Sequence, residues 1–124
     1  MLRAPGQPHL LRNAASGDVL AQHVELAVDS ASRRRGLLGR ESFAPGSALI
    51  IAPCSAIHMF SMRFAIDVVF VGRTGRVLKT CAAVQPGRMA FRIGAYAAIE
   101  LPAGTLAGSP ARPGEAVQLV PQPT

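Results

Sequence analysis

The stretch of the chain richest in reactive side chains is CSAIHMFSMRFAIDVVFV, at positions 54–71. It places the Cys54 thiol, the His58 imidazole and the Arg63 guanidinium close in sequence to the Asp67 carboxylate, with methionines between them. Side chains of these types can bind anions, coordinate metals or transfer protons. Because they are embedded among apolar residues, the same pattern is also typical of a buried core. The stretch is therefore a candidate site whose chemistry depends on which side chains the fold exposes.

A binding site for an anion is the interpretation we favour. A guanidinium beside aromatic and thioether groups suits a planar anion, because it can donate two parallel hydrogen bonds to a carboxylate while the apolar groups shield the contact from water. We therefore expect a small soluble binding or interaction domain whose site surrounds the motif IHMFSMRFAID and takes a small anionic ligand or a protein partner. No metal and no cofactor are expected. The residues predicted to bind the ligand are His58, Phe60, Met62, Arg63, Asp67, Arg35 and Arg40.

A small metal-dependent or hydrolytic enzyme that uses His58, Asp67 and Glu100 is the alternative. An imidazole with two carboxylates is a ligand set that hard or borderline cations accept, although no tight ligand spacing links these three residues. The enzyme needs His58 and a carboxylate within about 3 to 5 Å of each other across an open cleft. If Asp67 meets only backbone amides or an arginine inside the core, the enzyme loses its base.

Two further possibilities involve cysteine. Cys54 lies four residues before His58, with methionines nearby, which is compatible with a soft metal such as Cu(I), but lone methionines are more typical of core filling. A nucleophile formed by Cys54 or Cys81 with His58 needs a thiolate-stabilising environment that a sequence does not display. The two cysteines form no CxxC pair, and we expect free thiols.

Asp67 stands inside the best predicted strand of the chain, FAIDVVFV. Alternate residues of that strand are apolar on both faces, so we expect the carboxylate to be buried or flanked by apolar groups. A buried ionised carboxylate needs a cation or several amide donors. Arg35, Arg40 and loop amides are the candidate partners. We favour a structural carboxylate that fixes the entry to the strand, and a catalytic or ligand-binding role for Asp67 is the alternative.

The elements that must position these residues are mostly short strands. Alternation and β-branched residues predict strands at 23–29, 48–52, 64–71, 76–84, 95–102 and 116–120, with a hairpin turn at 72–75 and a loop at 85–95. A short helix over 31–38 can be capped by Asp29 or Ser30, and Gly36 suggests close backbone packing or an early end. At most one helical turn follows at 105–110. The fold class is α+β: a small, barrel-like, mostly antiparallel curled sheet with one or two short helices.

Length and composition limit the remaining classes. A chain of 124 residues predicts one domain, over residues 21–121, preceded by a flexible tail at 1–20. One weak strand within about the first 17 residues is the alternative to a wholly flexible tail. The net charge of +6 comes almost wholly from arginine, and the basic residues are scattered except at 33–40. With 5% aromatic residues there is no stacking platform for single strands, so we expect no nucleic-acid partner. No apolar run is long enough to span a membrane, and we expect a cytoplasmic protein with no membrane partner.

Several motifs together resemble a known family, the bacterial and archaeal proteins called domain of unknown function 192. They are RGLLGR at 35–40, IHMFSMRFAIDVVFV at 57–71, GRV at 75–77, ELPAG at 100–104 and RPGE at 112–115, and they span about residues 22–120. The resemblance implies a compact, barrel-like α+β fold and no established reaction. The chain departs from the family pattern at Met59, Ser61, Ala65 and Glu115, where Thr, Gly or Trp, Pro and Asp are usual.

Overall fold

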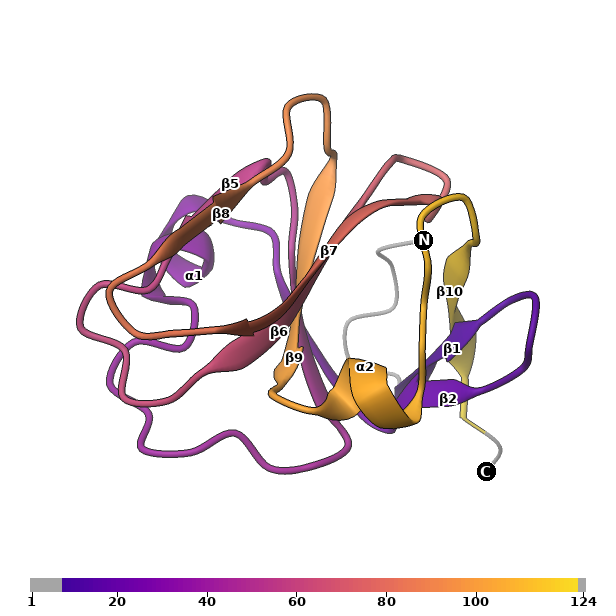
Figure 1. Ribbon diagram of the computed structural model, residues 1–124, viewed down its shortest axis with the longest axis horizontal. Coiled ribbons are helices and arrows are strands. Elements are labelled where there is room, and N and C mark those ends of the chain that lie inside the picture. Colours follow the sequence, from indigo (N-terminus) through magenta and orange to yellow (C-terminus); the bar gives the residue numbers. More distant parts are fainter. Residues whose placement is uncertain (1–7, 123–124) are drawn as a thin grey trace.

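The computed structural model describes residues 8–122, which form ten strands and two short helices. The strands make three sheets (Figure 1). A five-stranded sheet has the order β3-β4-β9-β6-β7, a three-stranded sheet the order β10-β1-β2, and a two-stranded sheet pairs β5 with β8. The strands are β1 (His9–Asn13), β2 (Val19–Ala21), β3 (His23–Ala27), β4 (Ser47–Ile51), β5 (Ala56–His58), β6 (Ile66–Val71), β7 (Val77–Val84), β8 (Met89–Phe91), β9 (Ala97–Pro102) and β10 (Val117–Pro121).

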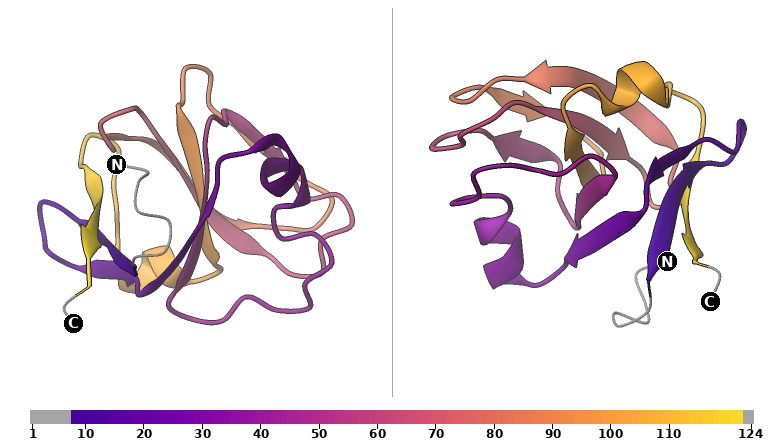
Figure 2. Two further views of the ribbon diagram at one scale, coloured as in Figure 1. Left: turned by 180° about the vertical axis from the view of Figure 1, so that it is seen from behind. Right: turned by 90° about the horizontal axis from the view of Figure 1, so that it is seen from below.

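The five-stranded sheet divides the molecule into two halves. The three-stranded sheet packs on one side of it, while α1 (Ser30–Arg35) lies with β5 and β8 on the other side (Figures 1 and 2). Side chains alternate between the two halves along each central strand. Two apolar cores result: the first lies against the three-stranded sheet, and the second lies on the side of α1, β5 and β8. On β9, for example, Ile99 and Leu101 belong to the first core, and Ala98 belongs to the second. Both faces of the central strands are therefore buried, which explains their continuous runs of apolar residues.

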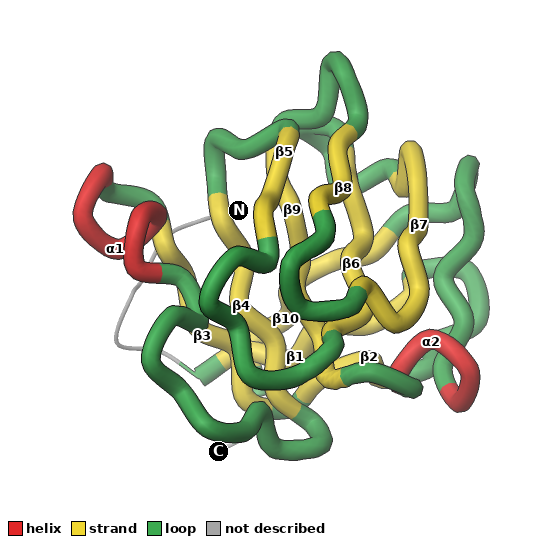
Figure 3. Tube along the Cα trace, turned by 60° about the vertical axis from the view of Figure 1, so that its left-hand side comes forward, coloured by secondary structure: helices red, strands yellow, loops and turns green. Residues whose placement is uncertain are grey.

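The fold class predicted from the sequence is confirmed in its main features. All strand pairs are antiparallel except β3 with β4. Parallel strands need a crossover connection, and the one between β3 and β4 contains α1. The second helix, α2 (Thr105–Gly108), is a single turn (Figure 3). Among the described strands no sheet closes into a barrel, so the barrel-like part of the prediction is not confirmed.

Two sequence expectations differ from the structure. A flexible tail was preferred for residues 1–20, with one weak strand as the alternative, and β1 and most of β2 lie there; residues 1–7 fall outside the described residues. Leu11 is completely buried, and β1 pairs along its whole length with β10, a partner that is distant in sequence. The segment 85–95, expected to be a loop, contains β8, whose partner β5 is also a strand of only three residues. Strands this short leave little periodic signal.

The hairpin turn predicted at 72–75 is present, and it contains the most constrained glycine of the chain. Gly75 has a φ of +88°, and a Cβ atom built there would lie 2.3 Å from the backbone oxygen of Val117. That oxygen belongs to β10, whose Val117 amide also donates a hydrogen bond to the Gly75 carbonyl. Only glycine allows this close approach of the hairpin to the last strand.

We expect Gly75→Ala to lower the free energy of unfolding by about 2 kcal/mol, because it combines backbone strain with a steric clash. Urea unfolding measures the change. Gly46→Ala is the matched control, since Gly46 has a φ of +85° but a Cβ atom added to it would meet nothing within 4 Å. Equal losses in the two variants would show that backbone conformation alone, and not contact with β10, explains the effect.

Within residues 8–122 neither helix has the length and the apolar composition needed to cross a membrane.

Candidate functional site

A cavity of about 450 Å³ lies between α1, β5 and the face of the five-stranded sheet that bears the second core. Apolar side chains form its walls, among them Leu37, Ile51, Ile57, Met59 and Met62. Its polar lining consists of Ser30, Arg33, Arg34, Arg35, Cys54, His58 and Glu100. An apolar cavity with a few convergent polar groups is the usual form of a small-molecule site.

Helix α1 brings the positive charge. The Asp29 side chain accepts a hydrogen bond of 2.7 Å from the Ser32 amide and so caps the helix, as the sequence predicted. The helix ends at Gly36, whose φ is +47°, and is therefore shorter than the predicted span 31–38. Its three consecutive arginines, Arg33, Arg34 and Arg35, all contribute to the cavity lining.

Glu100 supplies the negative charge. It lies on β9 opposite Leu49 of β4 and Val68 of β6, in the middle of the sheet, and only 6% of its surface is exposed. Burial raises the pKa of Glu100 to about 7, and the charge of Arg40 only partly opposes this. Within residues 8–122 its carboxyl group has no hydrogen bond or ion pair, and no polar side-chain atom is both fully buried and unpaired. The carboxyl oxygens must therefore retain some access to the cavity.

Cys54 and His58 complete the polar lining from the β4–β5 connection and β5. The Cys54 thiol donates a hydrogen bond of 3.1 Å to the Ala56 carbonyl, and burial raises the pKa of this thiol. A thiol held in its protonated form is a poor nucleophile, which argues against the Cys–His pair. His58 is exposed and stacks on Phe60, with ring centroids 4.9 Å apart.

Asp67 has the environment of a structural carboxylate, the role that the sequence favoured over a place in the site. It faces the opposite half of the molecule from Glu100, because it pairs with Leu101 while Glu100 pairs with Val68. Its side chain is 1% exposed and accepts three hydrogen bonds from backbone amides: Ala83 at 2.8 Å, Gly104 at 3.2 Å and Leu106 at 2.9 Å. Asp67 therefore holds the bulge of β7 and the start of α2 to the central sheet.

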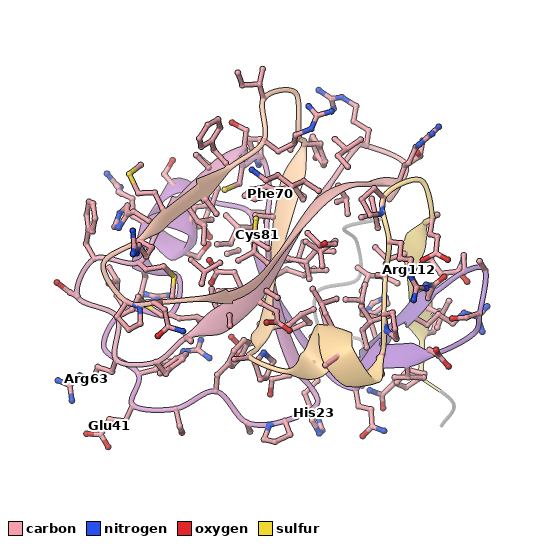
Figure 4. All side chains as sticks on the ribbon, in the orientation of Figure 1. His23, Glu41, Arg63, Phe70, Cys81 and Arg112 are labelled. Carbon is pink, nitrogen blue, oxygen red and sulfur yellow. The ribbon has the colours of Figure 1, made fainter. Side chains whose placement is uncertain are left out.

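The structure brings together only some of the residues predicted to bind a ligand. His58, Met62 and Arg35 line the cavity, whereas Phe60, Arg63, Arg40 and Asp67 are not part of its lining. Arg40 forms an ion pair of 2.7 Å with Glu25. Arg63 approaches Glu41 to 3.5 Å at the exposed edge (Figure 4). Both arginines thus have acidic partners outside the cavity.

The ligand set of the enzyme alternative is not assembled. Among the described residues no three His, Cys, Asp or Glu side chains lie close enough to hold a metal ion. Asp67 and Glu100 are on opposite faces of the sheet. Asp67 pairs with Leu101, the neighbour of Glu100, and successive side chains of a strand point to opposite faces. The condition set for the enzyme fails at Asp67, which meets only backbone amides.

Sequence reasoning placed the arginines at 33–40 beside the site but singled out only Arg35 and Arg40 among them, and it considered Glu100 only as a residue of a metal-dependent or hydrolytic enzyme. The run of three arginines beside Arg40 was a usable signal, because it is the one cluster of charge in the chain. No comparable signal marked Glu100 as the carboxyl group of the cavity. Its environment is made by β4, β6 and α1, which are remote from it in sequence.

Comparisons with known proteins place the chain in a sequence family and a fold. The family model DUF192, described as Uncharacterized ACR, matches residues 11–119. A crystal structure of a protein of unknown function from Novosphingobium aromaticivorans DSM 12444 matches with a TM-score of 0.76 and 24% identity, over 90% of this chain and 83% of that one. A candidate transcription regulator from Sinorhizobium meliloti 1021 matches with a TM-score of 0.75 and 24% identity, over 91% of this chain and 92% of that one. No curated protein matches.

Proposed function

The chain belongs to the DUF192 family of uncharacterised proteins, and we propose that it is a small-molecule binding protein whose ligand carries an anionic group and a hydrogen-bond donor. One observation carries this proposal: three arginines and a buried carboxyl group without a protein partner among the described residues line the same apolar cavity. The arginines of α1 would bind the anion. Glu100 would accept a hydrogen bond from the ligand, which compensates for its removal from water.

The rest of the cavity limits the ligand to a molecule with an apolar body. The walls contributed by Leu37, Ile51 and Met59 offer no hydrogen bonds beyond the backbone. A volume of about 450 Å³ accommodates a molecule of metabolite size. A short aliphatic acid with a hydroxyl group at its other end has the required chemistry, and 6-hydroxyhexanoate is a convenient probe.

We expect 6-hydroxyhexanoate to bind more tightly than hexanoate, by roughly tenfold if its hydroxyl group reaches Glu100. Titrations of the ¹⁵N-labelled protein followed by NMR give both affinities and locate the shifts. The amides of α1 and β9 should respond. If neither acid perturbs these amides at tens of millimolar, the cavity is not an anion site and the proposal is wrong.

Variants separate the two contacts. Arg33→Gln should weaken both acids, whereas the matched control Arg63→Gln should leave them unchanged, because Arg63 lies outside the cavity lining. Glu100→Leu should remove the preference for the hydroxylated acid without abolishing binding of hexanoate. Loss of binding in Arg63→Gln but not in Arg33→Gln would show that the ligand binds at the exposed part of the IHMFSMRFAID motif, as predicted from the sequence, and not in the cavity.

Several finer expectations stay predictions. They are the barrel-like curl of the sheet, the cytoplasmic location and the single domain over residues 21–121. The Sinorhizobium protein is described as a candidate transcription regulator. We do not extend that description to this chain, since the proposed site uses its arginines around an apolar cavity and not along an open surface.

A further inference from the structure

The two-stranded sheet of β5 and β8 has one buried face and one apolar face that the described chain leaves uncovered. Ile57 and Ala90 are opposite each other and point into the second core. His58 and Met89 are also opposite each other, as are Ala56 and Phe91, and these side chains share the other face. Met89 is 62% exposed and Phe91 is 56% exposed.

Two loops extend this exposed face. Phe60 follows β5, is 51% exposed and stacks on His58. Ile93 follows β8 and is 80% exposed, in a connection that projects from the body of the molecule (Figure 1). We define the β5–β8 face as Phe60, Met89, Phe91 and Ile93. Large apolar side chains gathered in this way usually mark an interaction surface.

The charged residues that adjoin the β5–β8 face, by sequence along β8 or by contact with Phe91, are basic. Arg88 and Arg92 stand directly before and after β8, next in sequence to Met89 and Phe91, and both are exposed. The Lys79 ammonium lies 5.2 Å from the centre of the Phe91 ring and donates a hydrogen bond to the Phe91 carbonyl. Asp67 is the one acidic residue between positions 42 and 99, and it is buried among backbone amides. No carboxylate from this part of the chain neutralises the cations of the face.

We propose that the β5–β8 face docks on an anionic membrane surface. Two copies of this chain would place cations against cations, so the face does not suit a symmetric dimer. Its apolar side chains lie on the two-stranded sheet and on the connections that follow β5 and β8. Such side chains can enter the headgroup region of a bilayer, whereas a protein partner would need a pocket that fits them. The adjoining arginines are attracted to anionic lipids, and apolar burial adds to that attraction. The expectation of no membrane partner considered only spanning segments.

Co-sedimentation of the full chain with vesicles tests the proposal. We expect binding to vesicles of equal parts phosphatidylglycerol and phosphatidylcholine, little binding to pure phosphatidylcholine, and loss of binding at about 0.5 M salt. Phe91→Ser with Ile93→Ser should weaken binding at least tenfold. The matched control is Val19→Ser with Val28→Ser, which removes exposed apolar side chains elsewhere and should change little.

A second pair of variants tests the charges. Arg88→Gln with Arg92→Gln should weaken binding roughly tenfold or more, since each cation near an anionic surface contributes about fivefold. The control, Arg12→Gln with Arg112→Gln, removes the same charge from the other half of the molecule, where Figure 4 labels Arg112. Equal effects of the two charge pairs would show attraction by net charge alone and overturn the proposal. So would binding to a soluble peptide of alternating Glu and Leu without binding to vesicles, which would assign the face to an acidic protein.

Discussion

Asp67→Ala is expected to lower the free energy of unfolding by about 4 kcal/mol, because three backbone amides lose a charged acceptor at once and each hydrogen bond to a charged group contributes about 1.5–3 kcal/mol. The amides of Ala83, Gly104 and Leu106 come from β7, from the turn after β9 and from α2. One side chain therefore joins three segments to β6. Urea unfolding followed by circular dichroism measures the loss.

Two controls define the origin of that loss. Asp18→Ala removes an exposed carboxylate whose side chain makes no hydrogen bond among the described residues, so its effect should be within about 0.5 kcal/mol. His58→Ala should leave the melting temperature nearly unchanged, since His58 is exposed. A melt that ranks His58→Ala below Asp67→Ala in stability would contradict this assignment of roles.

The most regular elements of the fold were predictable because their patterns are local. The strand Ile66–Val71, the hairpin turn after it and the Asp29 cap of α1 each follow from side chains within a few residues of one another. β5 and β8 were missed, and β1 was considered only as a weak alternative to a flexible tail, because the stability of these strands comes from partners far along the chain, as in the pairing of His9 with Pro121. A three-residue strand contains too few positions for alternation to be recognised.

The candidate site was predictable only in part for the same reason. His58, Met62 and Arg35 come from motifs that are visible in the sequence, and the fold places them at one cavity. Whether Asp67 or Glu100 reaches that cavity depends on which face of the sheet each side chain occupies. Both residues stand in apolar strands, and only the register of β6 against β9 assigns them to opposite faces. Composition and spacing contain no information on that register.

Glu100→Gln is expected to stabilise the protein above neutral pH, the opposite of the effect at Asp67. The pKa of Glu100 is raised from 4.5 to about 7 in the folded protein by burial. A carboxyl group with a raised pKa binds its proton more tightly when folded, so its contribution to stability is complete below pH 4.5 and is lost as the pH rises to 7. At pH 8 the ionised carboxylate then lowers stability by about 3 kcal/mol relative to pH 4, and Gln cannot ionise.

The test compares urea unfolding of the wild-type protein and Glu100→Gln between pH 4 and pH 8. The difference in free energy of unfolding should grow across pH 4.5–7 and remain constant above that range. Because both proteins contain the same other titratable groups, subtracting one free energy of unfolding from the other cancels the contributions of those groups. The raised pKa of Cys54 keeps its thiol protonated throughout this pH range. Glu41→Gln is the control, because it removes an exposed carboxylate outside the cavity lining and should not reproduce the effect of Glu100→Gln.

This pH profile also distinguishes the two kinds of carboxylate in the fold. A structural carboxylate such as Asp67 has amide donors in place, and its removal destabilises the protein. A carboxyl group that serves a ligand lacks those donors until the ligand arrives, and its ionised form destabilises the unliganded protein. A flat profile for Glu100→Gln would mean that Glu100 is already solvated or paired, and the cavity would lose the group proposed to accept a hydrogen bond from its ligand.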